Sequence, residues 1–199
     1  LQLGTNRSQE STPILVGDTL YVTSSFGPKN VFAVNAKTGE VRWKYSPEMP
    51  KGVDQYACCD VNSRGVSYND GKIFFGRLDA QVTALDAKTG KEIWTSKVVD
   101  YTQGSVITSP PTLVKNMVIT GFGGGEYGVR GALVALDQAT GKEIWRTEAP
   151  KRTLEKIHSI GSHAQSTSSS DGRIVVTAAR QFGARGVGID IVNHCIDDV

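Results

Sequence analysis

The chain has 199 residues, of which 39% are hydrophobic and 21% are charged. Its formal net charge of +2 is too close to neutrality for a surface that binds nucleic acid or an anionic membrane through Lys and Arg. No apolar run approaches the roughly 20 residues of a membrane-spanning helix. The composition therefore argues against a nucleic-acid partner and a membrane span in this chain, and it leaves room for a good hydrophobic core.

Residues 1–11 are polar and carry no periodic pattern. The next stretch alternates apolar and polar residues on both sides of a Gly-Asp pair, which predicts a two-stranded β-hairpin. The same pattern occurs twice more along the chain. The three expected hairpins, each given with its turn, are residues 12–25 around Gly17-Asp18, residues 66–75 around Asn69-Asp70-Gly71, and residues 112–120 around Lys115-Asn116.

A second hairpin pattern follows each of the first ones and repeats with a constant period. Its copies read F-A-V-N-A-K-T-G-E-V-R-W at 32–43, T-A-L-D-A-K-T-G-K-E-I-W at 83–94 and V-A-L-D-Q-A-T-G-K-E-I-W at 134–145. The tryptophans that end them stand at positions 43, 94 and 145, a constant step of 51 residues. A period of about 50 residues indicates a solenoid, a propeller or an array.

Each copy has the residues of a tight turn between two strands. The Asp or Asn that ends the first strand can accept hydrogen bonds from backbone N–H groups further on, and the Thr-Gly pair supplies a residue that tolerates positive φ. The alternation then resumes and holds one Trp at a fixed place on the second strand. An isolated surface hairpin with a core Trp explains one copy but not three in register. We therefore expect four-stranded blades of a β-propeller, each flat face covered by the next blade.

Three such units give an all-β fold but do not close a ring, because propellers have about four to eight blades. The sequence also begins at Leu1, without a charged and then apolar leader. We expect an incomplete β-propeller of about three blades over residues 1–149, taken from a longer protein. A divergent tail over residues 150–199 is expected to follow it.

The linker at 48–64 contains two adjacent cysteines, Cys58 and Cys59. One interpretation is that they are two ordinary thiols. The other is a disulfide between neighbours, which strains the peptide between them. Such strain is kept where the surroundings hold it, commonly at a functional site, and the bond presumes an oxidising compartment. Cys195 then remains as a free thiol.

The linker at 121–131 reads G-F-G-G-G-E-Y-G-V-R-G. It is not a phosphate-binding loop, because it lacks G-K-[ST] and does not open a helix. Its glycines would let the backbone approach a flat ligand, and Glu126 offers two oxygens to a cation such as calcium. The alternative is a plain loop between strands, with Glu126 in solvent and paired with Arg130.

These motifs together resemble the quinoprotein alcohol dehydrogenases, the methanol and ethanol dehydrogenase family that uses pyrroloquinoline quinone (PQQ) and calcium. The resemblance covers about residues 8–149 and implies an eight-bladed parent propeller that is exported to the periplasm. The residues that carry it are Gln9-Glu10-Ser11-Thr12-Pro13, Cys58-Cys59-Asp60 followed by Arg64-Gly65-Val66, Ile107-Thr108 before Pro111, the G-E-Y-G-V-R-G run at 125–131, and the tryptophan repeats.

The resemblance also implies roles for single residues. Glu10, Arg64 and Thr108 would bond the carboxylates and carbonyls of PQQ, and a Cys58–Cys59 disulfide would stack on one face of its ring. Three glycines would line the edge of the cofactor, and Glu126 would ligate calcium. The residues implied to bind the cofactor are Glu10, Cys58, Cys59, Arg64, Thr108, Gly123, Gly124 and Gly125, and the residue implied to bind the metal is Glu126.

By the same resemblance, the parent enzyme oxidises a primary alcohol to an aldehyde with hydride transfer to PQQ, and a cytochrome c-type protein accepts the electrons. The family's catalytic Asp, its Asn calcium ligand and its Trp on the other quinone face have no matching position here. We therefore expect no catalytic residue in this chain and no activity from it alone. The competing hypothesis is a non-catalytic β-propeller scaffold of the outer-membrane assembly type, which has no use for Glu10, the cysteine pair or Glu126.

The pattern changes after the third repeat. Residues 151–161 are basic and compatible with a short helix. Residues 171–191 resemble the first nucleotide-binding motif of class I S-adenosylmethionine methyltransferases, in which Asp190 would hold the ribose. The alternative is a degenerate fourth blade, because Asp-Gly-Arg-Ile at 171–174 matches Asp-Gly-Lys-Ile at 70–73. No Thr-Gly-x-x-x-Trp follows, which counts against the blade.

Overall fold

The computed structural model describes residues 10–24, 30–57, 62–148, 169–170 and 175–176 of the chain. Within these ranges the regular structure is β-strand, apart from three short 3-10 helices. These helices are η1 (Val53–Tyr56), η2 (Tyr101–Gln103) and η3 (Gly125–Tyr127). No helix in the described ranges has the length and apolar content needed to cross a bilayer. The expectation of an all-β fold is confirmed.

Three antiparallel sheets of four strands each account for residues 14–148, and in every sheet the strands pair in chain order. The first sheet comprises β1 (Ile14–Val16), β2 (Thr19–Ser24), β3 (Asn30–Asn35) and β4 (Val41–Tyr45). The second comprises β5 (Ser67–Asn69), β6 (Lys72–Gly76), β7 (Gln81–Asp86) and β8 (Glu92–Lys97). The third comprises β9 (Thr112–Val114), β10 (Met117–Thr120), β11 (Ala132–Asp137) and β12 (Glu143–Glu148).

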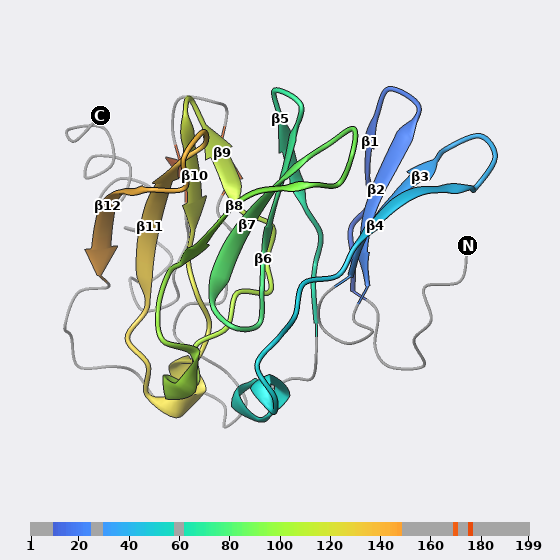
Figure 1. Ribbon diagram of the computed structural model, residues 1–199. Coiled ribbons are helices and arrows are strands. Elements are labelled where there is room, and N and C mark those ends of the chain that lie inside the picture. Colours follow the sequence, from blue (N-terminus) through green and yellow to red (C-terminus); the bar gives the residue numbers. More distant parts are fainter. Residues whose placement is uncertain (1–9, 25–29, 58–61, 149–168, 171–174, 177–199) are drawn as a thin grey trace.

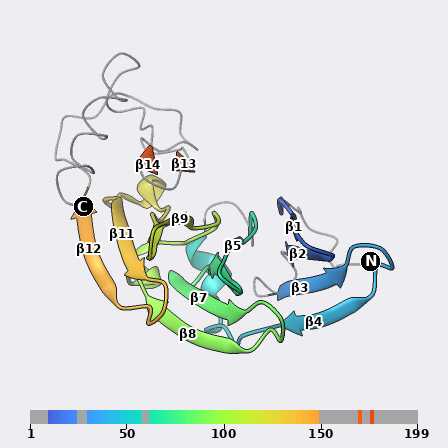
Figure 2. The ribbon, with the colours of Figure 1, turned by 90° about the horizontal axis from the view of Figure 1, so that it is seen from above.

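The three sheets stand side by side along an arc (Figure 1), with the first strand of each on the inner side and the fourth strand on the outer side (Figure 2). This is the arrangement of successive propeller blades. A separate two-stranded hairpin, β13 (Ser169–Ser170) and β14 (Val175–Val176), lies in the tail. The predicted helix at 151–161 and the predicted ribose ligand Asp190 lie outside the described residues.

The turn of the second hairpin pattern forms as expected in all three sheets. In the first sheet, Asn35 Oδ1 accepts hydrogen bonds from the backbone N–H groups of Lys37 and Thr38, at 2.9 and 3.2 Å. Gly39 then takes a φ of 78°, in the region that favours glycine. The same turns contain Gly90 and Gly141, whose φ values are 70° and 71°.

A β-bulge follows each of these turns and is not evident from the sequence. The register shifts between Ala33 and Val34 in the first sheet, and at the corresponding place in the other two. One residue is therefore left over just before each Trp. In the second and third sheets it is Ile93 and Ile144, which are 44% and 48% exposed although both are hydrophobic. The bulge brings the following Trp side chain onto the face that meets the next sheet.

Apolar residues from alternate strand positions fill the two interfaces between sheets. Between the first and second sheets, the buried side chains include Val31, Ile73 and Phe75. Between the second and third, they include Phe74 and Val118. Each central strand is thus buried on both faces, which explains its continuous apolar run.

The repeated Trp side chain packs against the turn of the following sheet, at one end of each interface. Trp43 Nε1 donates a hydrogen bond of 3.0 Å to the carbonyl of Ala87, and Trp94 Nε1 donates one of 3.1 Å to the carbonyl of Gln138. Each indole ring lies over the turn glycine of the following sheet. A Cβ added at Gly90 or Gly141 would come within 2.6 Å of the ring. The constant period of 51 residues therefore reflects a contact between a Trp and the turn of the next sheet, which occurs in both interfaces.

Candidate functional site

Three of the residues expected to bind a cofactor contact one another in the structure. Arg64 Nη2 lies 2.8 Å from Glu10 Oε2, and Arg64 Nη1 donates a hydrogen bond of 2.6 Å to Thr108 Oγ1. The backbone N–H of Arg64 also donates to the carbonyl of Thr108, at 2.8 Å. Each of these residues lies in the segment that precedes a different sheet, so the cluster joins the entry segments of all three sheets.

Backbone contacts hold the Glu10 and Arg64 segments together. Thr12 and Gly65 form an isolated parallel bridge, and the Thr12 N–H donates to the carbonyl of Arg64 at 3.1 Å. Gly65 has a φ of 127°, and a Cβ there would lie 2.8 Å from the carbonyl oxygen of Thr12. Only glycine permits this approach, which is why Arg-Gly stands as a pair. The sequence motif is thus partly a packing requirement.

A second set of contacts positions the segment that carries Thr108. The Ile107 N–H donates to the carbonyl of Arg77 at 3.2 Å. Ile107 also packs against Gly76, where an added Cβ would lie 2.1 Å from its side chain. The position of Thr108 is therefore fixed by the end of β6 as well as by Arg64.

The glycine-rich loop is joined to the same region. Gly123 bridges Val106, with its N–H donating to the Val106 carbonyl at 2.8 Å. Gly124 has a φ of 120°, and a Cβ there would lie 2.5 Å from the carbonyl oxygen of Gly104. The predicted glycines at 123 and 124 thus lie close to the backbone just before Thr108. The third, Gly125, begins η3.

The cluster is half-open to solvent. The side chains of Arg64 and Glu10 are 41% and 39% exposed. Arg64 contributes a planar guanidinium with donors fixed in a fork, a shape suited to flat anionic groups. Thr108 Oγ1 accepts from Arg64, so the Thr108 hydroxyl keeps its own proton for donation to a ligand.

Three other predicted site residues, or their side chains, lie outside the described part of the structure. Cys58 and Cys59 lie outside the described residues. The backbone of Glu126 belongs to η3, but its side chain lies outside the description. Among the described residues, no three His, Cys, Asp or Glu side chains are grouped as a metal site requires. Arg130 forms an ion pair with Glu148 at 2.8 Å. The disulfide and the metal ligand therefore remain predictions.

The structure contains a buried ion pair that no pattern in the sequence indicates. Arg77 Nε and Nη2 donate to the two carboxylate oxygens of Asp79, at 3.0 and 2.7 Å, and their side chains are only 7% and 1% exposed. Arg77 Nη2 also donates to the carbonyl of Glu48, at 3.2 Å. Arg77 thus connects the β6–β7 turn to the start of the linker that carries the cysteines. Neither charged residue recurs in the other two units, so the repeat gave no signal for it.

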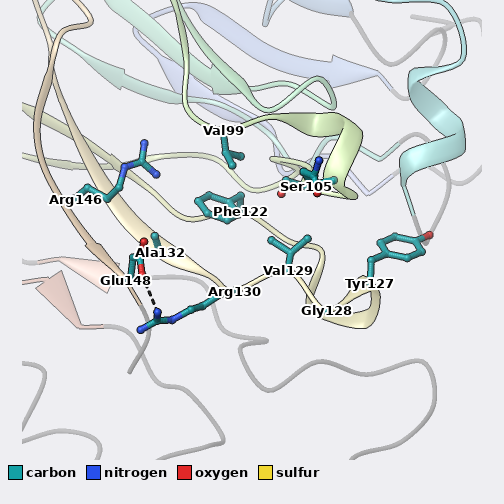
Figure 3. Close-up of a pocket in the computed structure, with 11 residues that line it drawn as sticks. Val99, Ser105, Phe122, Tyr127, Gly128, Val129, Arg130, Ala132, Arg146 and Glu148 are labelled. Carbon is teal, nitrogen blue, oxygen red and sulfur yellow. Dashed lines mark ion pairs between the residues drawn. The ribbon is translucent and has the colours of Figure 1, made fainter. Parts of the chain in front are cut away.

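A cavity of about 350 Å³ lies elsewhere, at the edge of the third sheet. Figure 3 shows Val129 and Arg130 of the glycine-rich loop beside Arg146 and Glu148 of β12, with the ion pair between Arg130 and Glu148. Of the predicted cofactor-binding residues that the structure describes, none lines this cavity. The Glu10–Arg64–Thr108 cluster, rather than this cavity, is therefore the candidate site.

Comparison with known proteins identifies the class. The family model of the PQQ proteins, described as "Glucose/ethanol/alcohol dehydrogenase, beta-propeller domain", matches residues 2–146. The chain belongs to this family of quinone-dependent dehydrogenases. Its three sheets are part of the propeller, as predicted, and the scaffold hypothesis is not supported.

Particular relatives agree with this assignment. The chain is 44% identical over 144 residues to a lanthanide-dependent methanol dehydrogenase of Methylacidiphilum fumariolicum (strain SolV), covering 71% of this chain and 23% of that protein. It is 33% identical over 194 residues to the dehydrogenase subunit of a quinone alcohol dehydrogenase of Acetobacter aceti, covering 94% of this chain and 25% of the relative. A solved europium-containing methanol dehydrogenase superposes with a TM-score of 0.72 at 41% identity, covering 76% and 26% of the two chains. The chain thus spans about a quarter of the length of these relatives.

Proposed function

We propose that this chain forms one wall of the PQQ site of an alcohol dehydrogenase, and that the whole protein oxidises a primary alcohol to an aldehyde. The observation that carries the proposal is the contact of Arg64 with both Glu10 and Thr108. The family resemblance implies a PQQ-binding role for these same three residues. Their contact across three separate segments supports a common anion-binding position.

The residues present fit the cofactor. PQQ is a flat quinone that carries carboxylates, and a guanidinium binds planar anions through its fork of donors. The Glu10 carboxylate holds the Arg64 fork in one orientation, and the Thr108 hydroxyl supplies a further donor. Loop glycines at 123 and 124 remove side chains from the neighbouring backbone. When bound, the quinone supplies the hydride acceptor, while the protein supplies position and charge.

The remaining site residues are proposed on the resemblance alone. Cys58 and Cys59 would form a disulfide on one quinone face, Gly125 would complete the edge of the site, and Glu126 would ligate a hard cation. The cation is calcium or a lanthanide, since the relatives include proteins named for a lanthanide and for europium and both are hard cations that oxygen ligands bind. The other metal ligands and the base would come from beyond the matching region.

The setting of the enzyme is part of the same proposal. A vicinal disulfide requires an oxidising compartment, which supports the periplasm as the location. Relatives named quinohemoprotein alcohol dehydrogenases support a cytochrome c-type electron acceptor.

Equilibrium dialysis of the chain against PQQ tests the proposal. The change Arg64→Ala should weaken binding at least tenfold, because charge-assisted hydrogen bonds contribute about 1.5–3 kcal/mol. The matched control is Arg42→Ala, which breaks an exposed ion pair with Asp18 of 2.6 Å away from the cluster, and should leave binding unchanged. Equal loss in both variants, or no effect of Arg64→Ala, would reject the site.

A further inference from the structure

The cavity at the edge of the third sheet contains a buried hydroxyl without a partner. Ser105 lines this cavity of about 350 Å³ and is fully buried. Its Oγ has no hydrogen-bond partner among the described residues. A buried polar group that makes no hydrogen bond destabilises the folded state. The Ser105 hydroxyl can therefore gain a hydrogen bond from a molecule that enters the cavity.

A fixed cation lines the same cavity, on the other side of the Phe122 ring from Ser105 in the view of Figure 3. Arg146 donates to both carboxylate oxygens of Glu143, at 3.2 and 2.8 Å, and to the carbonyl of Val98, at 2.7 Å. These hydrogen bonds use Nε and Nη2, and within the described ranges no group accepts from Nη1. The guanidinium is thus held in place and keeps a donor for an anionic group such as a carboxylate.

A second arginine at the cavity has a partner that a ligand can replace. Arg130 forms the 2.8 Å ion pair with Glu148, and their side chains are 39% and 61% exposed. An ion pair this exposed contributes little to stability, so a ligand carboxylate can take the place of Glu148 at small cost. Glu148 follows Arg146 by two residues in β12, and side chains at that spacing share one face of a strand. The two arginines therefore line the same end of the cavity.

The walls between Ser105 and the arginines are apolar. Phe122, Val99 and Val129 line them. The Val129 N–H donates to the carbonyl of Gly124, at 3.1 Å, which fixes this wall of the glycine-rich loop. Aromatic and aliphatic walls favour a flat apolar ligand. The volume lies at the small end of ligand pockets, which span about 300–1,000 Å³, and so favours a ligand with a single ring.

We propose that this cavity is a binding site for a small aromatic carboxylate with a polar substituent at the far end of its ring. The carboxylate accepts hydrogen bonds from Arg146 and Arg130. The ring packs against Phe122, and the polar substituent pairs with the Ser105 hydroxyl. The simplest probe of this class is 4-hydroxybenzoate, which can be compared with benzoate, lacking the hydroxyl, and with 4-hydroxybenzamide, lacking the charge.

Isothermal titration calorimetry of the full chain with these three compounds tests the proposal. Arg146→Gln should weaken the binding of 4-hydroxybenzoate about tenfold, because it removes charge-assisted hydrogen bonds. It should also abolish the preference for 4-hydroxybenzoate over 4-hydroxybenzamide. The matched control is Lys44→Gln, since Lys44 follows the repeated Trp of the first sheet as Arg146 follows that of the third. This control removes a cation away from the cavity and should leave both affinity and preference unchanged.

Ser105→Ala tests the hydroxyl without disturbing the packing of the site. The change removes one buried polar atom and no apolar contact, so the urea midpoint should stay the same or rise. Binding of 4-hydroxybenzoate should weaken about fivefold, the effect of one hydrogen bond, while binding of benzoate should not change. A folded Ser105→Ala variant that keeps the full preference for 4-hydroxybenzoate over benzoate would contradict the proposal.

Three further outcomes would overturn it. Absence of saturable binding of all three compounds would show that the cavity holds only solvent. Equal affinity of the unmodified chain for 4-hydroxybenzoate and 4-hydroxybenzamide would show that the arginines do not select a carboxylate. Loss of binding in Arg64→Ala, together with full binding in Arg146→Gln, would assign the ligand to the Glu10–Arg64–Thr108 cluster. None of these results depends on whether the chain binds PQQ.

Discussion

Single glycines decide how closely successive sheets pack. Gly141 and Gly39 stand at the same place in the repeat and have similar φ values of 71° and 78°. A Cβ at Gly141 would meet the Trp94 ring at 2.6 Å, whereas a Cβ at Gly39 meets nothing within 4 Å. Comparing substitutions at these two positions therefore distinguishes the cost of backbone strain from the cost of overpacking.

We predict that Gly141→Ala destabilises the protein more than Gly39→Ala. Both changes carry the cost of positive φ, about 1–2 kcal/mol, but Gly141→Ala adds an overpacking cost of about 1–3 kcal/mol. Urea unfolding followed by Trp fluorescence measures the difference. Equal midpoints for the two variants would contradict the docking of Trp94 on this turn.

The turn carboxylates make stability depend on acid pH. Hydrogen bonds from the Thr89 hydroxyl and then from the Thr89 N–H, both 2.7 Å long, hold the pKa of Asp86 below its ordinary value of 3.8. The Thr140 hydroxyl lowers the pKa of Asp137 in the same way. A lowered folded-state pKa stabilises the protein above pH 4 or so, and that stabilisation is lost as pH falls below it.

We predict that the double change Asp86→Asn and Asp137→Asn flattens this acid dependence. Asn35 already makes the same turn with an amide oxygen, so stability at pH 7 should change little. The drop in urea midpoint between pH 6 and pH 3 should be smaller than in the unmodified chain. The reverse change, Asn35→Asp, should enlarge that drop, and the opposite ordering would refute the assignment.

At the scale of the element, the β6–β7 connection joins the linkers of the candidate site. Its Arg77–Asp79 pair is almost fully buried, and Gln81 Nε2 also donates to Asp79, at 2.6 Å. The carbonyl of Arg77 receives the N–H of Ile107 next to Thr108. The connection therefore helps to position the segment that carries Thr108, through the hydrogen bond to Ile107.

We predict that Arg77→Met lowers the free energy of unfolding by about 3–5 kcal/mol, because it leaves the Asp79 charge buried and unpaired. The double change Arg77→Met and Asp79→Leu should be much less harmful, since no charge is then buried. Arg42→Met, in the exposed pair with Asp18, should cost only about 0–1 kcal/mol. Urea unfolding measures all three, and a double variant as unstable as Arg77→Met would contradict the charge argument.

At the scale of the whole molecule, the three blades form one part of a propeller that belongs to the family of quinone-dependent dehydrogenases. The chain covers 23% of the related methanol dehydrogenase and 26% of the solved one. The family resemblance places the catalytic Asp beyond the region matched here, and we therefore expect the parent activity to require residues outside it.

We predict that this chain does not reduce an electron-accepting dye with a primary alcohol, even with PQQ and calcium or a lanthanide added. Free PQQ and the Arg64→Ala variant serve as background controls in the same assay. Turnover above both controls would show that the base is present in this chain after all.

The sequence predicted the blades well and the site only in part. Turn chemistry at Asn35 and the alternation of the strands are local, so the hairpins could be identified from neighbouring residues. The Arg77–Asp79 pair could not, because its burial depends on a linker about thirty residues away and has no counterpart in the repeat. Glu10, Arg64 and Thr108 were identified only through the family resemblance, since no local pattern connects them.

The sequence alone determined the period, the turns and the alternation, because each depends on the intrinsic geometry of a few adjacent residues. Only the tertiary structure decided the structural role of the period. Trp43 and Trp94 each donate a hydrogen bond to a carbonyl 44 residues further along the chain. It also decided that the N-terminal segment with Glu10 and the segment with Thr108 meet at Arg64. Contacts of this kind form when apolar faces stack, and the stacking, rather than any local preference, fixes which distant residues become neighbours.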